Sequence, residues 1–137
     1  MIKTPYVAVD GIIELCDDAG KVEGVVLIER KNPPYGWALP GGFVDIGETV
    51  EAALLREMKE ETSLDVEILS MVGVYSDPSR DPRFHTVSIV YRCRATGVPR
   101  AADDAKNLRI VPSHALSETE LLFDHSRIVS DYLRASS

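Results

Sequence analysis

Three glutamates at helical spacing stand in the middle of the sequence. Glu57, Glu60 and Glu61 occupy positions i, i+3 and i+4, so on a helix their carboxylates would lie about 5–6 Å apart and repel one another. A hard divalent cation removes this conflict, because Mg²⁺ takes oxygen ligands. No His or Cys stands at metal-binding spacing, which argues against zinc. Such a triplet is also common on purely structural helices, so its surroundings must decide between the two interpretations.

The direction of the carboxylates around the helix favours a site. At about 100° per residue, with Glu57 at zero, Glu61 falls near +40° and Glu60 near −60°. The apolar residues one and two turns earlier fall on the same side, at about +20°, −40° and +60° for Val50, Ala53 and Leu54. A solvated charged face should lie opposite the apolar stripe. We therefore expect the three carboxylates to point inward.

The residues upstream extend the pattern. Gly41 and Gly42 precede the helix, and a backbone without Cβ atoms can approach a metal or a phosphate closely. The whole stretch 41–64 reads GGFVDIGETVEAALLREMKEETSL. Its spacing resembles the Nudix box, the signature of the Nudix hydrolase family, at every position except one. Ser63 stands where the family has Gly as a left-handed helix cap, so we expect a cost of about 1 kcal/mol or a shifted helix end there, without loss of a ligand.

The resemblance implies roles for the residues that match. Nudix enzymes hydrolyse a nucleoside diphosphate linked to another moiety, by attack of water on phosphorus. By this resemblance Glu57, Glu60 and Glu61 hold Mg²⁺ or Mn²⁺, together with the backbone carbonyl of Gly41. Arg56 orients the carboxylates, and its partner is Glu48, which is alternatively a water-mediated ligand. The general base stays open between Glu57 and acids of distant loops, namely Asp77, Asp81, Glu118 and Glu120.

Other segments bear on the substrate. The run SDPSRDPRFH at 76–85 and the ending Phe123-Asp124-His125 resemble the ADP-ribose pyrophosphatase branch of the family. Arg80 and Arg83 are candidates to bind a phosphate or a terminal ribose. The alternative is that they pair with Asp77 and Asp81 and stiffen the loop.

Two aromatic residues flank the glycine segment. Tyr35 and Trp37 are candidates to stack on adenine, whereas packing in the core is the alternative for Trp37. A structural role is expected for each histidine, namely His85, His114 and His125.

Composition excludes several classes of protein. The 137 residues suit one domain, spanning 1–137. With 15 basic and 22 acidic residues, the net charge of −7 disfavours nucleic acid and anionic membranes as partners. The sequence lacks an apolar run of transmembrane length and the pattern of a signal peptide. Cys16 and Cys93 show no CxxC spacing, so we expect reduced thiols in a cytoplasmic protein.

The elements that must position the site are mostly strands. The pattern predicts an α/β (α+β) fold with a mixed sheet between helices, and the resemblance implies the Nudix-type α/β/α sandwich. Helices are expected at 50–62, capped by Thr49, and at 125–134, capped by Asp124. A loop is expected at 97–106. The expected strands are 6–16, 24–30, 37–39, 66–75, 86–94 and 108–111.

Three functions remain open at this stage. The first is hydrolysis of ADP-ribose to AMP and ribose 5-phosphate. The second is release of pyrophosphate from modified nucleoside triphosphates such as 8-oxo-dGTP. The third is a module that senses ADP-ribose without hydrolysing it, against which the intact glutamates argue. The resemblance also leaves a homodimer open, with active sites that use both subunits.

Overall fold

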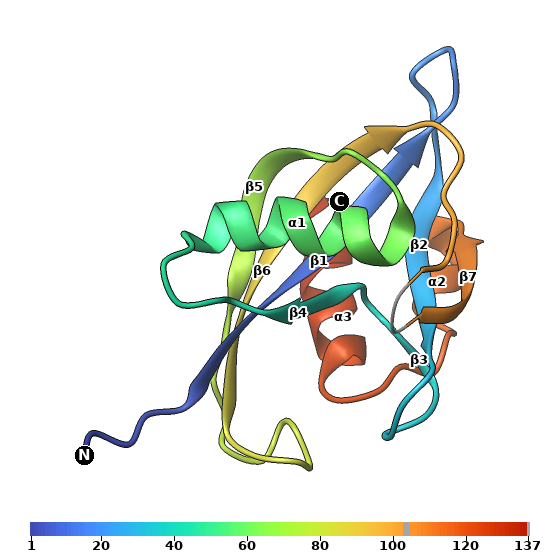
Figure 1. Cartoon of the computed structure of the whole chain (residues 1–137). Coiled ribbons are helices and arrows are strands. Elements are labelled where there is room, and N and C mark those ends of the chain that lie inside the picture. The colour runs from blue at the N-terminus through green and yellow to red at the C-terminus, as the bar shows by residue number, and fades with distance from the viewer. Residues whose placement is uncertain (103–104, 137) are drawn as a thin grey trace.

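One seven-stranded sheet with helices on both faces forms the molecule (Figure 1). The structure is a computed structural model, and it describes residues 1–102 and 105–136. The strands are β1 (Tyr6–Cys16), β2 (Val22–Arg30), β3 (Trp37–Ala38), β4 (Gly41–Phe43), β5 (Glu67–Tyr75), β6 (Thr86–Thr96) and β7 (Ala105–Val111). The helices are α1 (Val50–Thr62), α2 (Ser113–Leu116) and α3 (His125–Ser136).

The sheet is mixed, as the sequence predicts. Its order is β3-β2-β1-β6-β5, with β4 also paired to β1 and β7 to β2. Strands β1 and β6 are parallel over their full length, whereas the other pairs are antiparallel. Strand β1 is therefore the centre of the sheet, and β4 pairs directly with it.

Alternation along the strands builds a core on each face. Ile12 packs with Ile128 and Val129 of α3, whereas its neighbour Ile13 packs with Leu54 of α1. Figure 1 shows α1 lying across one face of the sheet and α3 on the other. This arrangement confirms the predicted sandwich. No helix in residues 1–102 and 105–136 is long and apolar enough to cross a membrane.

Helix α1 begins and ends where the sequence places it. The Thr49 hydroxyl accepts a hydrogen bond from the Ala52 amide at 3.1 Å. The helix ends at Ser63, which takes the left-handed conformation with φ 64° and ψ 15°. The missing cap glycine therefore does not shift the helix end, because Ser63 accepts the strained conformation itself.

Some boundaries differ from the predictions. Strand β2 begins two residues early, β7 begins within the expected loop 97–106, and residues 103–104 of that loop lie outside the described residues. Strand β4 and the one-turn helix α2 were not predicted, because each is too short to leave a periodic pattern.

Both carboxylate oxygens of Asp124 accept hydrogen bonds from Arg80, at 2.9 and 2.7 Å. Asp124 stands directly before α3, and its backbone carbonyl accepts a hydrogen bond from the Ile128 amide at 3.1 Å. It is therefore at the predicted start of the helix, with its side chain paired to Arg80.

Candidate active site

A cavity of about 170 Å³ lies where β1, β4 and α1 meet. Side chains of both charges line it. Carboxylates enter from β1, from α1 and from the loop after β5, whereas guanidinium groups enter from β2 and from that loop. The charged lining residues are Asp10, Glu57, Glu61, Asp81, Arg30, Arg80 and Arg83.

The two glycines of β4 allow the carboxylates to approach the backbone. The Gly41 amide donates a hydrogen bond to Oε1 of Glu61 at 2.7 Å. A Cβ atom on Gly42 would overlap the carboxyl group of Glu57, and one on Gly41 would overlap Asp10. Close packing, and not a turn, is therefore what requires glycine at these positions.

Arg56 is the hub of the acidic cluster. Its guanidinium donates two hydrogen bonds to Glu48, at 2.7 and 2.8 Å, and one to Glu57 at 2.7 Å. Further contacts reach the Phe43 carbonyl at 3.0 Å and Glu60 at 3.3 Å. The expected pairing of Arg56 with Glu48 is therefore present. Because a guanidinium has five donors in a fixed plane, it sets the orientation of the carboxylates around it.

The three glutamates differ in burial. The side chain of Glu57 is 13% exposed and that of Glu60 is 43% exposed, whereas Glu61 is only 5% exposed. The expectation that all three point inward is thus wrong for Glu60. A helical wheel gives direction around the helix axis, but it does not show how far the sheet covers the helix along that axis. Burial raises the pKa of Glu57, which the hydrogen bond from Arg56 partly offsets.

The donor set suits a hard cation. Glu57 and Glu61 line the cavity and offer carboxylate oxygens, and the gap left by the absent Cβ of Gly42 admits the Glu57 carboxyl group. Among the described residues, no three His, Cys, Asp or Glu side chains already surround one point as ligands. Arg56 and the Gly41 amide engage the carboxylates at present. The residues therefore fit Mg²⁺ or Mn²⁺ by chemistry, and a cation competes with these hydrogen bonds.

Arg80 and Arg83 both reach the cavity but have different partners. The side chain of Arg80 is 4% exposed and is paired with Asp124, so the predicted alternative of an Asp77 partner is wrong. Arg83 donates to Asp81 at 3.0 and 2.8 Å, as the other half of that alternative expects. Arg83 keeps 32% of its side chain exposed, which leaves it accessible to a ligand.

Tyr35 and Trp37 lie outside this cavity. They line a second depression of about 530 Å³ together with Glu118 and Glu120. The Trp37 ring packs against the core and carries the Arg109 guanidinium over it at 4.3 Å. Their proposed stacking on adenine thus has no support from the cavity that holds Glu57, and core packing accounts for Trp37.

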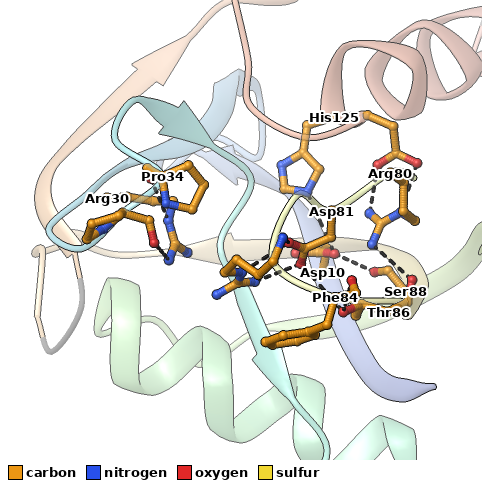
Figure 2. A network of polar contacts seen from close by, with 12 residues as sticks. Asp10, Arg30, Pro34, Arg80, Asp81, Phe84, Thr86, Ser88 and His125 are labelled. Atoms are coloured by element: carbon orange, nitrogen blue, oxygen red, sulfur yellow. Dashed lines mark hydrogen bonds and ion pairs between the residues drawn. The ribbon is translucent and has the colours of Figure 1, made fainter. Parts of the chain in front are cut away.

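The polar floor of the cavity was not predicted from the sequence. Asp10 accepts a hydrogen bond from the Ser88 hydroxyl, and its Oδ2 lies 3.8 Å from Nε2 of His125 (Figure 2). Burial lowers the pKa of His125, and its Nδ1 accepts from the Leu39 amide at 3.0 Å. The signal for Asp10 was a lone acid within the apolar strand YVAVDGIIELC. Its partners come from distant parts of the chain, so spacing does not predict them.

Comparison with known proteins identifies relatives of the whole chain. A model of the NUDIX domain matches residues 5–132. An ADP-ribose pyrophosphatase of Methanocaldococcus jannaschii is 49% identical over 133 residues, which cover 95% of this chain and 74% of that protein.

Solved structures give the same picture of the fold. A bifunctional NMN adenylyltransferase/ADP ribose pyrophosphatase from Francisella tularensis, complexed with AMP and a manganese ion, is 28% identical with a TM-score of 0.80. The match covers 99% of this chain but 43% of that one, so the present chain spans less than half of the larger protein. The NUDIX domain of Shewanella oneidensis NrtR, complexed with ADP ribose, has a TM-score of 0.82 at 23% identity. That match covers 99% of this chain and 91% of that one, and it bears on the fold alone.

Proposed function

This chain belongs to the Nudix family, and on that basis we propose that it hydrolyses ADP-ribose to AMP and ribose 5-phosphate with the help of a divalent cation. The observation that carries the proposal is the cavity in which Glu57 and Glu61 lie against the glycine backbone of β4. The similarity to the archaeal ADP-ribose pyrophosphatase, which extends over 95% of the chain, supports the choice of substrate.

The chain's own residues prepare the site for the cation. Glu57, Glu60, Glu61 and the Gly41 carbonyl would hold Mg²⁺ or Mn²⁺. When bound, the cation neutralises phosphate oxygens and lowers the pKa of a coordinated water. Arg56 holds the Glu57 carboxylate in place, and the Gly41 amide does the same for Glu61. These hydrogen bonds keep both carboxylates at the cavity before the cation enters and competes for their oxygens.

Position narrows the candidates for the general base. Glu118 and Glu120 line the second depression, and Asp77 is not part of the cavity lining. Asp81 does line it, but hydrogen bonds from Arg83 outweigh burial and hold the pKa of Asp81 below its usual value. A carboxylate with a low pKa is a weak proton acceptor. Glu57 is therefore the candidate that we favour.

A substrate comparison tests the proposal. The purified chain is incubated with Mg²⁺ and equal concentrations of ADP-ribose or 8-oxo-dGTP, and the products are identified by mass spectrometry. We expect AMP and ribose 5-phosphate from ADP-ribose, with no turnover in EDTA. A clear preference for 8-oxo-dGTP with release of pyrophosphate would refute the choice of substrate. Tight binding of ADP-ribose without turnover would instead indicate a sensor.

The proposal also includes a cytoplasmic location and a homodimer. Cys16 and Cys93 are buried free thiols, which supports the reducing environment of the cytoplasm. A homodimer stays a prediction, and the mass from light scattering at several concentrations tests it.

A further inference from the structure

Phe123 has a backbone conformation that a bulky residue rarely adopts. Its φ is 57°, in the left-handed region, and it directly precedes the ion-paired Asp124 and helix α3. Side chains other than Gly, Asn and Asp seldom occupy this region, and such conformations concentrate at ligand-binding sites. The ring of Phe123 also lines the proposed active-site cavity. The strained backbone of Phe123 therefore places its ring at the cavity.

The ring lies against two guanidinium groups. The Arg83 carbon Cζ is 5.5 Å from the centroid of Phe123, and that of Arg30 is 5.6 Å from it. Arg83 is also 5.7 Å from the ring of Phe43 and 5.2 Å from that of Phe84. A cation over an aromatic face is attracted by the ring's electron density. Three rings therefore surround Arg83.

The remaining contacts of Arg83 fix its orientation. Its Nε and Nη2 both donate to the Asp81 carboxylate, whose side chain is 4% exposed. Among the described residues no partner engages the third nitrogen, Nη1. The guanidinium is held in one plane, beside the cavity, with donors still available on Nη1. Because rings crowd the group, an oxygen atom reaches it more readily than a flat nucleobase does.

We propose that Phe123 is a positioning residue, because its ring holds the Arg83 guanidinium in place beside the cavity. Nη1 of Arg83 then binds an oxygen-rich group of the ligand, either the second phosphate or the terminal ribose. The inference rests on the proposed function, because it needs a nucleoside diphosphate in the cavity. Arg83 is then the binding residue, and the left-handed backbone of Phe123 is the cost of placing the ring. In this proposal the glutamates of the cavity hold the metal ion, and the Arg83 guanidinium binds another part of the substrate.

Arg92 offers a matched control for Arg83. It too donates from Nε and Nη2 to a buried acid, Glu14, and 34% of its side chain is exposed against 32% for Arg83. It lies outside the cavity. Replacing either arginine by lysine removes the same planar pair of hydrogen bonds to a buried acid and keeps the charge, so Arg92→Lys controls for the loss of that ion pair.

The first experiment measures ADP binding by calorimetry and the kinetics of ADP-ribose hydrolysis for Arg83→Lys and Arg92→Lys. We expect Arg83→Lys to raise the Kd for ADP, or the KM for ADP-ribose alone, about 10- to 100-fold with little change in kcat. An effect on ADP assigns Nη1 to a phosphate, and an effect on ADP-ribose alone assigns it to the ribose. Equal effects of the two variants would show that the lost ion pair acts through stability and would overturn the inference.

A double-mutant cycle tests the part played by Phe123. Phe123→Leu removes the ring but keeps apolar volume, and we expect about 3- to 5-fold weaker binding. In the Arg83→Lys background the same change should have a clearly smaller effect, because the part that acts through the Arg83 guanidinium is already lost. Additive losses would contradict a positioning role. If Phe123→Leu does not fold, Phe84→Leu, at an exposed residue whose ring also lies beside Arg83, tests whether the rings position this guanidinium.

Failure of the inference is distinguishable from failure of the proposed function. Absence of ADP-ribose turnover in the wild-type chain refutes the function, whereas calorimetry with ADP still tests Arg83. A wild-type chain that binds no ADP, in Mg²⁺ or in EDTA, would overturn the inference as well.

Discussion

Arg56 and Glu48 face each other in a two-point ion pair, from Nε to Oε2 at 2.7 Å and from Nη2 to Oε1 at 2.8 Å. The Asp45 amide donates to the same carboxylate at 2.9 Å. These hydrogen bonds, chiefly those from Arg56, lower the pKa of Glu48 to about 2. The pair therefore ties the loop before α1 to the helix that carries the proposed metal-binding glutamates, and it stays charged at neutral pH.

Loss of the Glu48 charge should reduce activity without unfolding the chain. In Glu48→Gln the amide cannot accept both guanidinium bonds, so Arg56 holds Glu57 less firmly. Partners of ligating side chains typically contribute about 10- to 100-fold to activity or metal affinity, and we expect a fall in kcat/KM of that size. Asp65→Asn removes an exposed ion pair with Lys59 near the same helix and should leave kcat/KM unchanged. An equal loss in both variants would argue against an orienting role.

Glu61→Gln should abolish metal-dependent hydrolysis while the fold is retained. Glutamine still accepts the hydrogen bond from the Gly41 amide, but it no longer brings a negative charge to the cation. We expect kcat/KM to fall more than about 100-fold and the Mg²⁺-induced rise in Tm to disappear. In EDTA the variant should be at least as stable as the wild type, because repulsion with Glu57 is relieved. Full activity of Glu61→Gln would show that the ligand assignment is wrong.

The absent side chain at position 42 gives a third prediction. In Gly42→Ala the new Cβ meets the Glu57 carboxyl group, so this group must move from the position in which it pairs with Arg56. We expect kcat/KM to fall at least about 10-fold, with a lower Tm. Gly73→Ala places a Cβ no closer than 3.3 Å to the Tyr75 ring, and steady-state kinetics should not distinguish it from the wild type.

The sequence predicts those features that depend on residues close together in the chain. Thr49 and the apolar stripe of α1 predict its start, and the resemblance of one continuous segment to the Nudix box implies the Arg56–Glu48 pair. The floor of the cavity is different, because Asp10 meets Ser88 across 78 positions of the chain. Asp124 illustrates the same limit. Its type and place predict a cap, yet Arg80 from 44 positions away takes its carboxylate, since a buried guanidinium needs a charged partner.

The stability of the chain should depend on pH through Glu14. Burial raises the pKa of this side chain, but hydrogen bonds from Arg92, Tyr132 and Arg94 outweigh burial and leave the pKa below the ordinary 4.5. The folded state thus favours the charged form. Its contribution to the free energy of unfolding is fully present above about pH 4.5 and is lost as the pH falls through the lower value of the folded state.

Glu14→Gln isolates this contribution. At pH 7 we expect the variant to lose about 1–3 kcal/mol of unfolding free energy, because Arg92 and Arg94 keep only a neutral partner. Urea titrations from pH 7 to pH 3 should show the gap to the wild type closing below about pH 4.5. Glu67→Gln, at the exposed start of β5, is the control. Its free energy of unfolding should follow that of the wild type across the same pH range. A gap that stays constant with pH would mean that packing, and not charge, is lost at Glu14.

Ser63→Gly should stabilise the chain. Serine pays about 1 kcal/mol or more for the left-handed conformation that ends α1, whereas glycine adopts it freely. Part of the gain is offset, because glycine has more freedom in the unfolded chain and the hydroxyl contact with the Arg100 carbonyl, at 3.3 Å, is lost. We expect a net rise of about 0.5 kcal/mol in urea denaturation. Ser63→Ala keeps the strain and loses the hydroxyl, so it should be less stable than the wild type. If the glycine variant also proves less stable, the bond to Arg100 outweighs the backbone strain.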